Sequence, residues 1–220
     1  MKKTPSNESL RTSPKLFLFI SGVIIFILFV FFSYLVHKNL FIHLDFDTTV
    51  RLQDKISRRF DGPFSLLSLI GSAEIVSILL LALWSFIKKL RYIFVLFIFG
   101  IIHAIEFFGK AFVTHPGPPH LFIRYDIGFS FPSSYVQPGS SYPSGHLART
   151  LFISTILIFV IYHLKKLSKT QKQMLYCAIA FFVGLMFVSR IYLGEHWLSD
   201  VIGGSLLGSS MGIFSLLLLL

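Results

Sequence analysis

Residues 16–36 read LFLFISGVIIFILFVFFSYLV, a stretch that contains no charged side chain. An apolar segment of about 20 residues is what an α-helix needs to cross the hydrocarbon core of a bilayer. Five further windows of this kind follow, near residues 64–87, 92–113, 145–164, 173–192 and 198–218. The sequence therefore predicts an all-α integral membrane protein whose six transmembrane helices form a bundle.

The composition excludes a soluble domain. Hydrophobic residues make up 54% of the 220 residues, and 26 of them are phenylalanine, far more than a soluble domain of this size carries. The first apolar run is longer than the core of a signal peptide, and no A-x-A-like cleavage site follows it. We therefore expect residues 16–36 to remain as a membrane anchor.

The basic residues predict the orientation. A formal net charge of +10 would suit a nucleic-acid partner, but eleven of the 20 Lys and Arg residues gather on one side of the predicted spans: Lys2, Lys3, Arg11, Lys15, Lys88, Lys89, Arg91, Lys165, Lys166, Lys169 and Lys172. Short loops rich in Lys and Arg face the cytoplasm. We therefore expect a multi-pass protein of the plasma membrane with a cytoplasmic N-terminus, with the lipid bilayer and not nucleic acid as its partner. The oligomeric state stays unknown.

The segments outside the spans divide the chain further. Residues 1–14 are polar and predict a cytoplasmic tail, and residues 15–220 form the membrane domain. Residues 41–60 form an outer segment, which is either a helix along the membrane surface or a solvated loop. Residues 114–143 hold six of the nine prolines, so they cannot form a regular helix. We expect them to form a packed outer loop, periplasmic or extracellular, that covers a site.

The sixth span begins with a histidine and an aspartate four residues apart. His196 and Asp200 would share one helix face, so the carboxylate can accept a hydrogen bond from one ring nitrogen and leave the other free to attack. The same face continues through Gly204, Gly208 and Gly212, which would let a neighbouring helix approach closely. This pattern favours a histidine that faces the bundle interior, whereas a histidine without such a partner would be a packing or interfacial residue.

The fourth span opens with the sequence PSGH at residues 143–146. A helix that begins at Pro143 would present the backbone N–H groups of Ser144, Gly145 and His146 to an anion, and phosphate fits such a place. The alternative is a simple helix cap. Arg190, at the outer end of the fifth span, would add a guanidinium group whose geometry matches phosphate oxygens.

Lys110 lies near the outer end of the third span. It would add a second cation to the same depth of the membrane. Its alternative is an ion pair with Glu106, one helical turn earlier.

These residues resemble the motifs of the type 2 phosphatidic acid phosphatase (PAP2) superfamily. The resemblance covers residues 41–218 and rests on Lys110, on Pro143-Ser144-Gly145-His146, and on Ser189-Arg190 followed by His196 and Asp200. The second and third motifs are complete. The first departs from the family pattern, because Gly117-Pro118 stands where the family has Arg-Pro. His115, Arg124 and Arg149 are candidates to replace this phosphate ligand.

The resemblance implies a membrane lipid phosphate or pyrophosphate phosphatase that works through a phosphohistidine intermediate at the outer face of the membrane. His196 would be the nucleophile, Asp200 would support its ring, and His146 would act first as a general acid and then as a general base. Lys110, Ser144, Gly145 and Arg190 would bind the phosphate oxygens, and we call these four residues the phosphate site. The resemblance implies neither a metal ion nor another cofactor.

Two alternatives stay open at the level of sequence. A lipid phosphotransferase would use the same intermediate with an alcohol in place of water. A non-catalytic lipid-binding or transport protein of the same fold is suggested by the missing arginine, and the carboxylates of Glu74 and Glu106 within the spans could then serve an ion path.

Overall fold

The computed structural model describes residues 14–87, 92–129, 131 and 139–220. Within these ranges the chain consists of helices and connecting segments, without a strand. The helices are α1 (Pro14–His37), α2 (Ile42–Lys55), η1 (Arg58–Phe60), α3 (Asp61–Ile70), α4 (Ala73–Ile87), α5 (Ile93–Phe112), η3 (His120–Phe122), α6 (Gly145–His163), α7 (Lys169–Tyr192) and α8 (Leu198–Leu219). Residues 1–13 of the predicted tail, and with them Lys2, Lys3 and Arg11, lie outside the described residues, as do Lys88, Lys89 and Arg91.

The predicted membrane bundle is confirmed, with one correction to its second span. Among the described residues, α1, α5, α6, α7 and α8 are each long and apolar enough to cross a membrane. The pair Arg58–Ile70 and Ala73–Ser85, bent by 47°, makes a sixth candidate if the two helices count as one broken span. We expected a continuous helix there. Instead α3 ends at Ile70 with Gly71 as its C-cap, and the Ser72 hydroxyl accepts a hydrogen bond from Ile75 N–H, which caps the start of α4.

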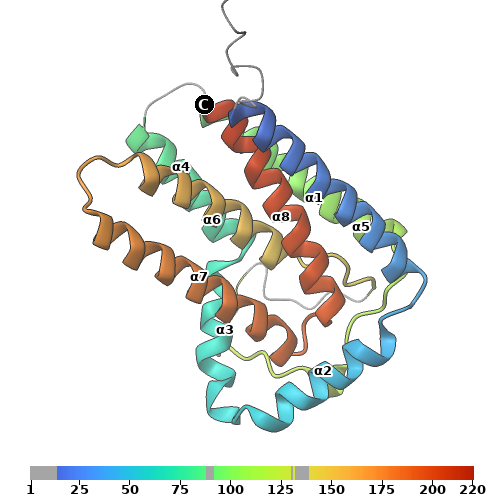
Figure 1. The fold of residues 1–220 in the computed structure, drawn as a ribbon. Coiled ribbons are helices and arrows are strands. Elements are labelled where there is room, and N and C mark those ends of the chain that lie inside the picture. Colours follow the sequence, from blue (N-terminus) through green and yellow to red (C-terminus); the bar gives the residue numbers. More distant parts are fainter. Residues whose placement is uncertain (1–13, 88–91, 130, 132–138) are drawn as a thin grey trace, which may run out of the picture.

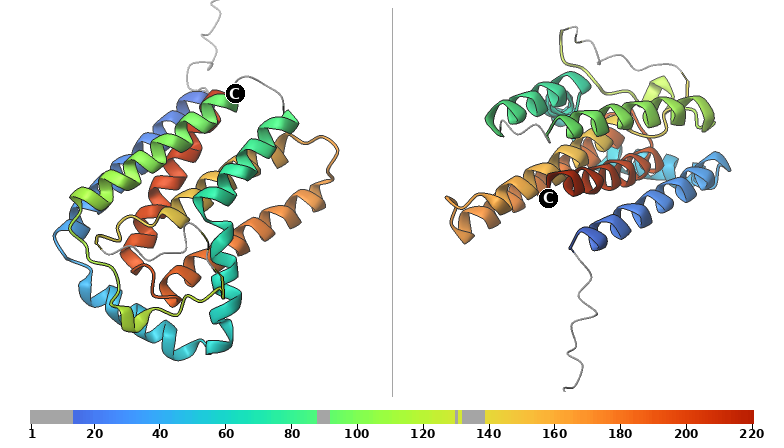
Figure 2. Two further views of the ribbon diagram at one scale, coloured as in Figure 1. Left: turned by 180° about the vertical axis from the view of Figure 1, so that it is seen from behind. Right: turned by 90° about the horizontal axis from the view of Figure 1, so that it is seen from above.

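Helices α6 and α8 form the centre of the bundle. Figures 1 and 2 show α8 lying along α1 on one side and crossing α6 on the other. A β-carbon on Gly204 would collide with the backbone carbonyl of Ser144, and one on Gly208 with that of Ala148. The predicted glycine ridge is therefore the surface of α8 against which α6 packs.

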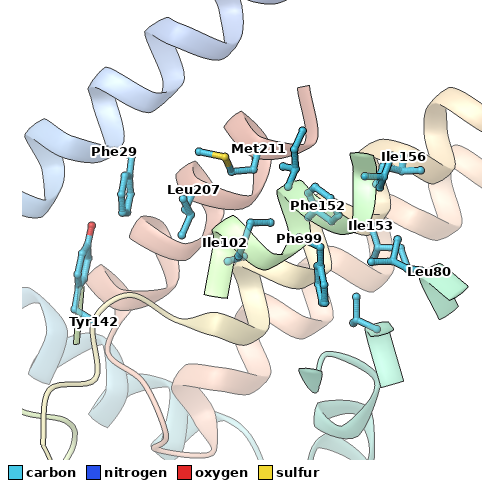
Figure 3. Packing of buried hydrophobic residues seen from close by; sticks show 14 of the residues in the cluster. Phe29, Leu80, Phe99, Ile102, Tyr142, Phe152, Ile153, Ile156, Leu207 and Met211 are labelled. Carbon is cyan, nitrogen blue, oxygen red and sulfur yellow. The ribbon is translucent and has the colours of Figure 1, made fainter. Parts of the chain in front are cut away.

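The apolar core fills the space between these central helices and their neighbours. Phe152 of α6, Leu207 of α8 and Ile102 of α5 are fully buried, and Figure 3 shows them in one layer. Phe29 of α1 stacks on Tyr142 with ring centroids 6.3 Å apart. The segment that precedes α6 is therefore tied to α1 as well as to α8.

One end of the bundle, which we call the site end, is where α1, α5 and α7 finish and α3, α6 and α8 begin. Helix α2 runs across it (Figure 1), so the segment 41–60 is helical over Ile42–Lys55, and its place along the membrane surface stays a prediction. The described part of the outer loop packs here too, because Trp197 Nε1 donates to the Pro116 carbonyl at 2.7 Å. The α6–α7 turn, with Lys165 and Lys166, lies at the opposite end.

Candidate active site

His196 and Asp200 meet at the N-terminus of α8. His196 Nδ1 lies 3.4 Å from Asp200 Oδ2, and the same oxygen accepts from the backbone N–H of Trp197 at 2.9 Å. The pair does not lie within one continuous helix, because α8 begins at Leu198. Asp200 is fully buried, whereas His196 keeps 9% of its surface exposed. The fixed carboxylate holds Nδ1, so Nε2 is the ring nitrogen left to react.

His146, in the first turn of α6, lies in the same place. A β-carbon on Gly71 would come within 3.2 Å of His146 Cδ2, so the ring lies against the α3–α4 bend. Ser144 N–H donates to the Asp200 carbonyl at 3.0 Å, which joins the beginnings of α6 and α8 directly. The charged groups that act on the His146 ring are those of Arg190, Arg149, His196 and Lys110. The structure thus brings both histidines and three cations together.

Arg190 is buried but keeps unused hydrogen-bond donors. Its side chain is fully inaccessible, and NH1 donates to Glu195 Oε2 at 2.7 Å. Among the described residues, its Nε and NH2 have no hydrogen-bond partner. A buried guanidinium with unpaired donors is costly unless a ligand satisfies them. The free edge of Arg190 is therefore suited to bind two oxygens of a phosphate group.

Glu106 of α5 holds two of the cations. Its Oε1 accepts from Lys110 Nζ at 2.8 Å, and its Oε2 accepts from Arg149 NH1 at 2.7 Å. Arg149 Nε also donates to the Gly71 carbonyl at 3.1 Å. The ion pair expected as the alternative for Lys110 is thus present, and Arg149 pairs with the same carboxylate. A β-carbon on Gly145 would collide with the Glu106 carboxyl group, so this ionic cluster borders the start of α6.

The start of α6 differs in detail from the prediction. The helix begins at Gly145 with Ser144 as its N-cap, not at Pro143. The backbone N–H of Ser144 is already used by the Asp200 carbonyl and is not free for an anion. The Ser144 hydroxyl is buried and has no hydrogen-bond partner within the described ranges. It is therefore the hydroxyl, not the backbone N–H, of Ser144 that remains available to a ligand.

The three candidates for the missing arginine lie in different places. Arg149 is the one whose charge acts on His146. Arg124 packs over the Tyr192 ring, 5.0 Å from its centroid. His115 Nε2 lies 3.5 Å from Asp200 Oδ1 and 3.6 Å from Asp45 Oδ2, where carboxylates would repel a phosphate group.

Asp45 of α2 is a buried part of this site that the sequence analysis did not identify. Its Oδ1 accepts from the backbone N–H of Ser199 at 2.8 Å, and its Oδ2 accepts from the Ser199 hydroxyl at 2.7 Å. Burial raises the pKa of Asp45, and the bonds from Ser199 and the charge of His115 partly offset that rise. The contact joins residues 154 positions apart, so a local sequence pattern could not predict it.

The chain is similar to known proteins in sequence and in fold. A model of the PAP2 superfamily matches residues 88–219. Phosphatidylglycerophosphatase B of Bacillus subtilis (strain 168) is 31% identical over 114 residues, which cover 51% of this chain and 50% of that protein. The chain therefore matches about half the length of this curated relative.

Two solved structures have a similar fold. A transmembrane PAP2-type phosphatidylglycerolphosphate phosphatase from Bacillus subtilis aligns with a TM-score of 0.72 at 21% identity, over 88% of this chain and 93% of that chain. Aquifex aeolicus LpxE aligns with a TM-score of 0.60 at 23% identity, over 79% of this chain and 94% of that chain. At these identities, the two structures support the fold alone.

Proposed function

Because the chain belongs to the PAP2 superfamily, we propose that it is a membrane lipid phosphate phosphatase that forms a phosphohistidine on His196. The observation that carries this proposal is the meeting of the His196–Asp200 pair with His146 beside the unpaired donors of Arg190. Covalent catalysis needs a fixed nucleophile, and proton transfer needs a second titrating group within reach. Phosphoryl transfer also needs clustered positive charge.

In the first step, the lone pair of His196 Nε2 attacks phosphorus while Asp200 holds Nδ1–H. The bond between phosphorus and the lipid oxygen breaks, and His146 donates a proton to that oxygen. In the second step, His146 accepts a proton from water, the water oxygen attacks phosphorus, and the phosphorus–nitrogen bond breaks. Inorganic phosphate leaves, and both histidines return to their starting states.

The phosphate site stabilises the charge that develops on the phosphoryl oxygens. Arg190 offers Nε and NH2, and Ser144 offers its hydroxyl. Gly145 allows the close approach of the backbone, and Lys110 lies at the edge with 39% of its side chain exposed. Arg149 supplies charge that the family otherwise takes from the arginine replaced here by Gly117. Such preorganised donors stabilise the transition state more than the ground state.

An apolar cavity beside the site suits a lipid substrate. It has a volume of about 280 Å³ and is lined by Ile70, Leu79, Thr150, Ile153, Ser154, Leu157, Leu175, Ala178, Ile179 and Phe182. Thr150 is one helical turn from His146, and Leu157 is two turns further along α6. An acyl chain in this cavity would leave its headgroup at the site end. We infer that the substrate is an amphiphile whose phosphate group enters while its tails stay in the membrane.

The class of substrate follows from this geometry and from the relatives. Phosphatidylglycerol phosphate, phosphatidic acid and undecaprenyl pyrophosphate each combine an apolar tail with a terminal phosphate. The lysine-rich α6–α7 turn lies at the end opposite the site. By the positive-inside rule, the site then faces the outside of a plasma membrane.

Phosphate release from this lipid panel tests the proposed function. Purified protein in detergent should hydrolyse at least one of the three lipids with EDTA present, with a bell-shaped dependence of kcat/KM on pH, since the two histidines start in opposite protonation states. His196→Ala should lower the rate at least about a hundredfold, whereas the exposed His43→Ala should leave it unchanged. Unaltered turnover in His196→Ala would rule out the mechanism.

A further inference from the structure

Behind Asp200, on the side away from the His196 ring, lies a buried polar cluster that the proposed reaction does not use. It consists of Asp45 from α2, His115 from the outer loop and Ser199 from α8, each exposed by 3% or less. His115 Nε2 lies 3.1 Å from Ser199 Oγ and 3.5 Å from Asp200 Oδ1. The cluster therefore joins three separate parts of the chain to the carboxylate that supports the nucleophile.

The hydrogen bonds determine which ring nitrogen of His115 carries a proton. The Ser199 hydroxyl donates to Asp45 Oδ2, so its oxygen can only accept from His115. Nε2 is then the protonated nitrogen, and its N–H also faces the two carboxylates. The Asp45 carboxylate in turn accepts the backbone N–H of Ser199, in the first turn of α8. Asp45 thus acts as an N-cap supplied by another helix and complements the helix dipole.

We propose that His115 and Asp45 are positioning residues that, with Ser199, hold the Asp200 carboxylate in place and through it orient the His196 ring for attack on phosphorus. Asp200 has two oxygens with separate tasks. Oδ2 accepts from Trp197 N–H and faces His196, while Oδ1 faces His115. Among the described residues, Oδ1 accepts no hydrogen bond, and the His115 Nε2–H group lies 3.5 Å from it. Without His115 this contact would be lost, and the carboxylate could rotate away from His196. This inference rests on the proposed function of His196.

The backbone of His115 shows how the loop holds this ring in place. Its N–H donates to Ser140 Oγ at 3.3 Å, and its carbonyl accepts from the backbone N–H of Ser141 at 3.0 Å. The loop around His115 is therefore hydrogen-bonded to Ser140 and Ser141, in the segment that leads into α6. The other groups that act on this network are Tyr142, whose hydroxyl is close enough to be influenced by Asp200, and His146, which is influenced by His196.

Steady-state kinetics of matched variants tests the proposal. His115→Leu removes the N–H donor and should lower kcat about 10- to 100-fold, the usual effect of losing an outer partner of a reactive group, with KM changed less than about twofold. The acid limb of the kcat/KM profile should also move to higher pH, because Asp200 would then attract the His196 proton more strongly. His115→Gln keeps a side-chain N–H and should recover most of kcat. His120→Leu, exposed in the same loop, is the control.

A second readout separates this proposal from the proposed function. Diethyl pyrocarbonate modifies neutral histidine, and peptide mass spectrometry can follow His196 with the exposed His43 as an internal reference. At pH 6, modification of His196 should be at least about threefold slower in His115→Leu than in wild type, and near wild type in His115→Gln. Equal rates in all three proteins would overturn the positioning role, as would full kcat in His115→Leu. A wild type that hydrolyses no lipid phosphate would contradict the proposed function. The modification rates of His196 would still test whether His115 orients its ring.

Discussion

Arg190 illustrates what one residue contributes to the site. Its NH1 is held by Glu195, while its Nε and NH2 lack partners in the described part of the chain. The carboxylate fixes the plane of the guanidinium, so the two remaining donors point in a defined direction. A lysine would keep the charge but lose this geometry.

Arg190→Lys should therefore lower kcat/KM on the order of 100- to 1,000-fold, the usual effect of losing a donor to a developing oxyanion. Phosphate release from the preferred lipid measures this effect. Glu195→Gln is the control, because its amide oxygen can still accept from NH1 and should leave kcat/KM within about tenfold of wild type. Equal activity of Arg190→Lys and wild type would mean that Arg190 does not bind the phosphate.

At the scale of single residues, local motifs predict candidates and the partners one helical turn away, but not the partners from other helices. His146, Arg190, His196 and Asp200 were candidates because their motifs are local, and the pairs His196–Asp200 and Lys110–Glu106 are present in the structure. The contacts of Asp45 with Ser199 and of Glu106 with Arg149 could not be predicted, because each joins helices that are distant in the sequence. The PSGH motif at residues 143–146 also could not show that the backbone N–H of Ser144 donates to the backbone carbonyl of Asp200.

At the scale of elements, the α3–α4 bend positions His146. Hydropathy predicts one long span here, since it depends on composition and not on where a helix breaks. The break exposes the Gly71 carbonyl to Arg149 and leaves room for the His146 ring. The bend is therefore part of the site and not only a distortion of the span.

Gly71→Ala should lower kcat by roughly threefold to tenfold, because its β-carbon would come within 3.2 Å of both His146 and Thr150 and displace the ring. Gly100→Ala, in the middle of α5, is the matched control, since a β-carbon there meets nothing within 4 Å. It should keep full activity and stabilise the protein by about 0.5–1 kcal/mol. Thermal unfolding and kcat together distinguish displacement of the ring from loss of folding.

The apolar cavity between α4, α6 and α7 gives a second test at this scale. Ala178→Trp should fill part of it and raise KM for long-chain lipid phosphates about tenfold, while a water-soluble aryl phosphate should be hydrolysed as by wild type. Ala180 lies two residues further along α7, outside the cavity lining. Ala180→Trp should therefore change neither the KM for long-chain lipid phosphates nor the hydrolysis of the aryl phosphate. If the two tryptophan variants behave alike, the cavity does not hold the substrate tail.

At the scale of the whole molecule, the orientation of the bundle decides from which side of the membrane the lipid phosphate reaches the site. Apolar length and charge predict six spans and an orientation, and the described helices provide five candidate spans, or six if the bent pair of α3 and α4 is one span. Of the basic residues used for the orientation, Lys165, Lys166, Lys169 and Lys172 lie together at the end away from the site.

Cysteine labelling measures this orientation. In a variant lacking Cys177, the chain's single cysteine, a cysteine at Lys166 should react with a membrane-impermeant maleimide only in inverted vesicles. A cysteine at Asp54, exposed on α2, should react in intact cells. The expected contrast follows from the preference of Lys- and Arg-rich loops for the cytoplasm. The reverse pattern would place the site on the cytoplasmic side.

The central claim is that two histidines from separate helices act on one phosphate group through a covalent intermediate on His196. Rapid acid-free quenching with ³²P-labelled lipid phosphate, followed by peptide mapping, tests it most directly, because phosphohistidine is stable to alkali. Label should appear on the peptide that contains His196 and vanish in His196→Ala. In His146→Ala label should form and disappear more slowly, because this variant lacks both the acid for the first step and the base for the second. Steady turnover with no labelled protein, or label on another residue, would contradict the account.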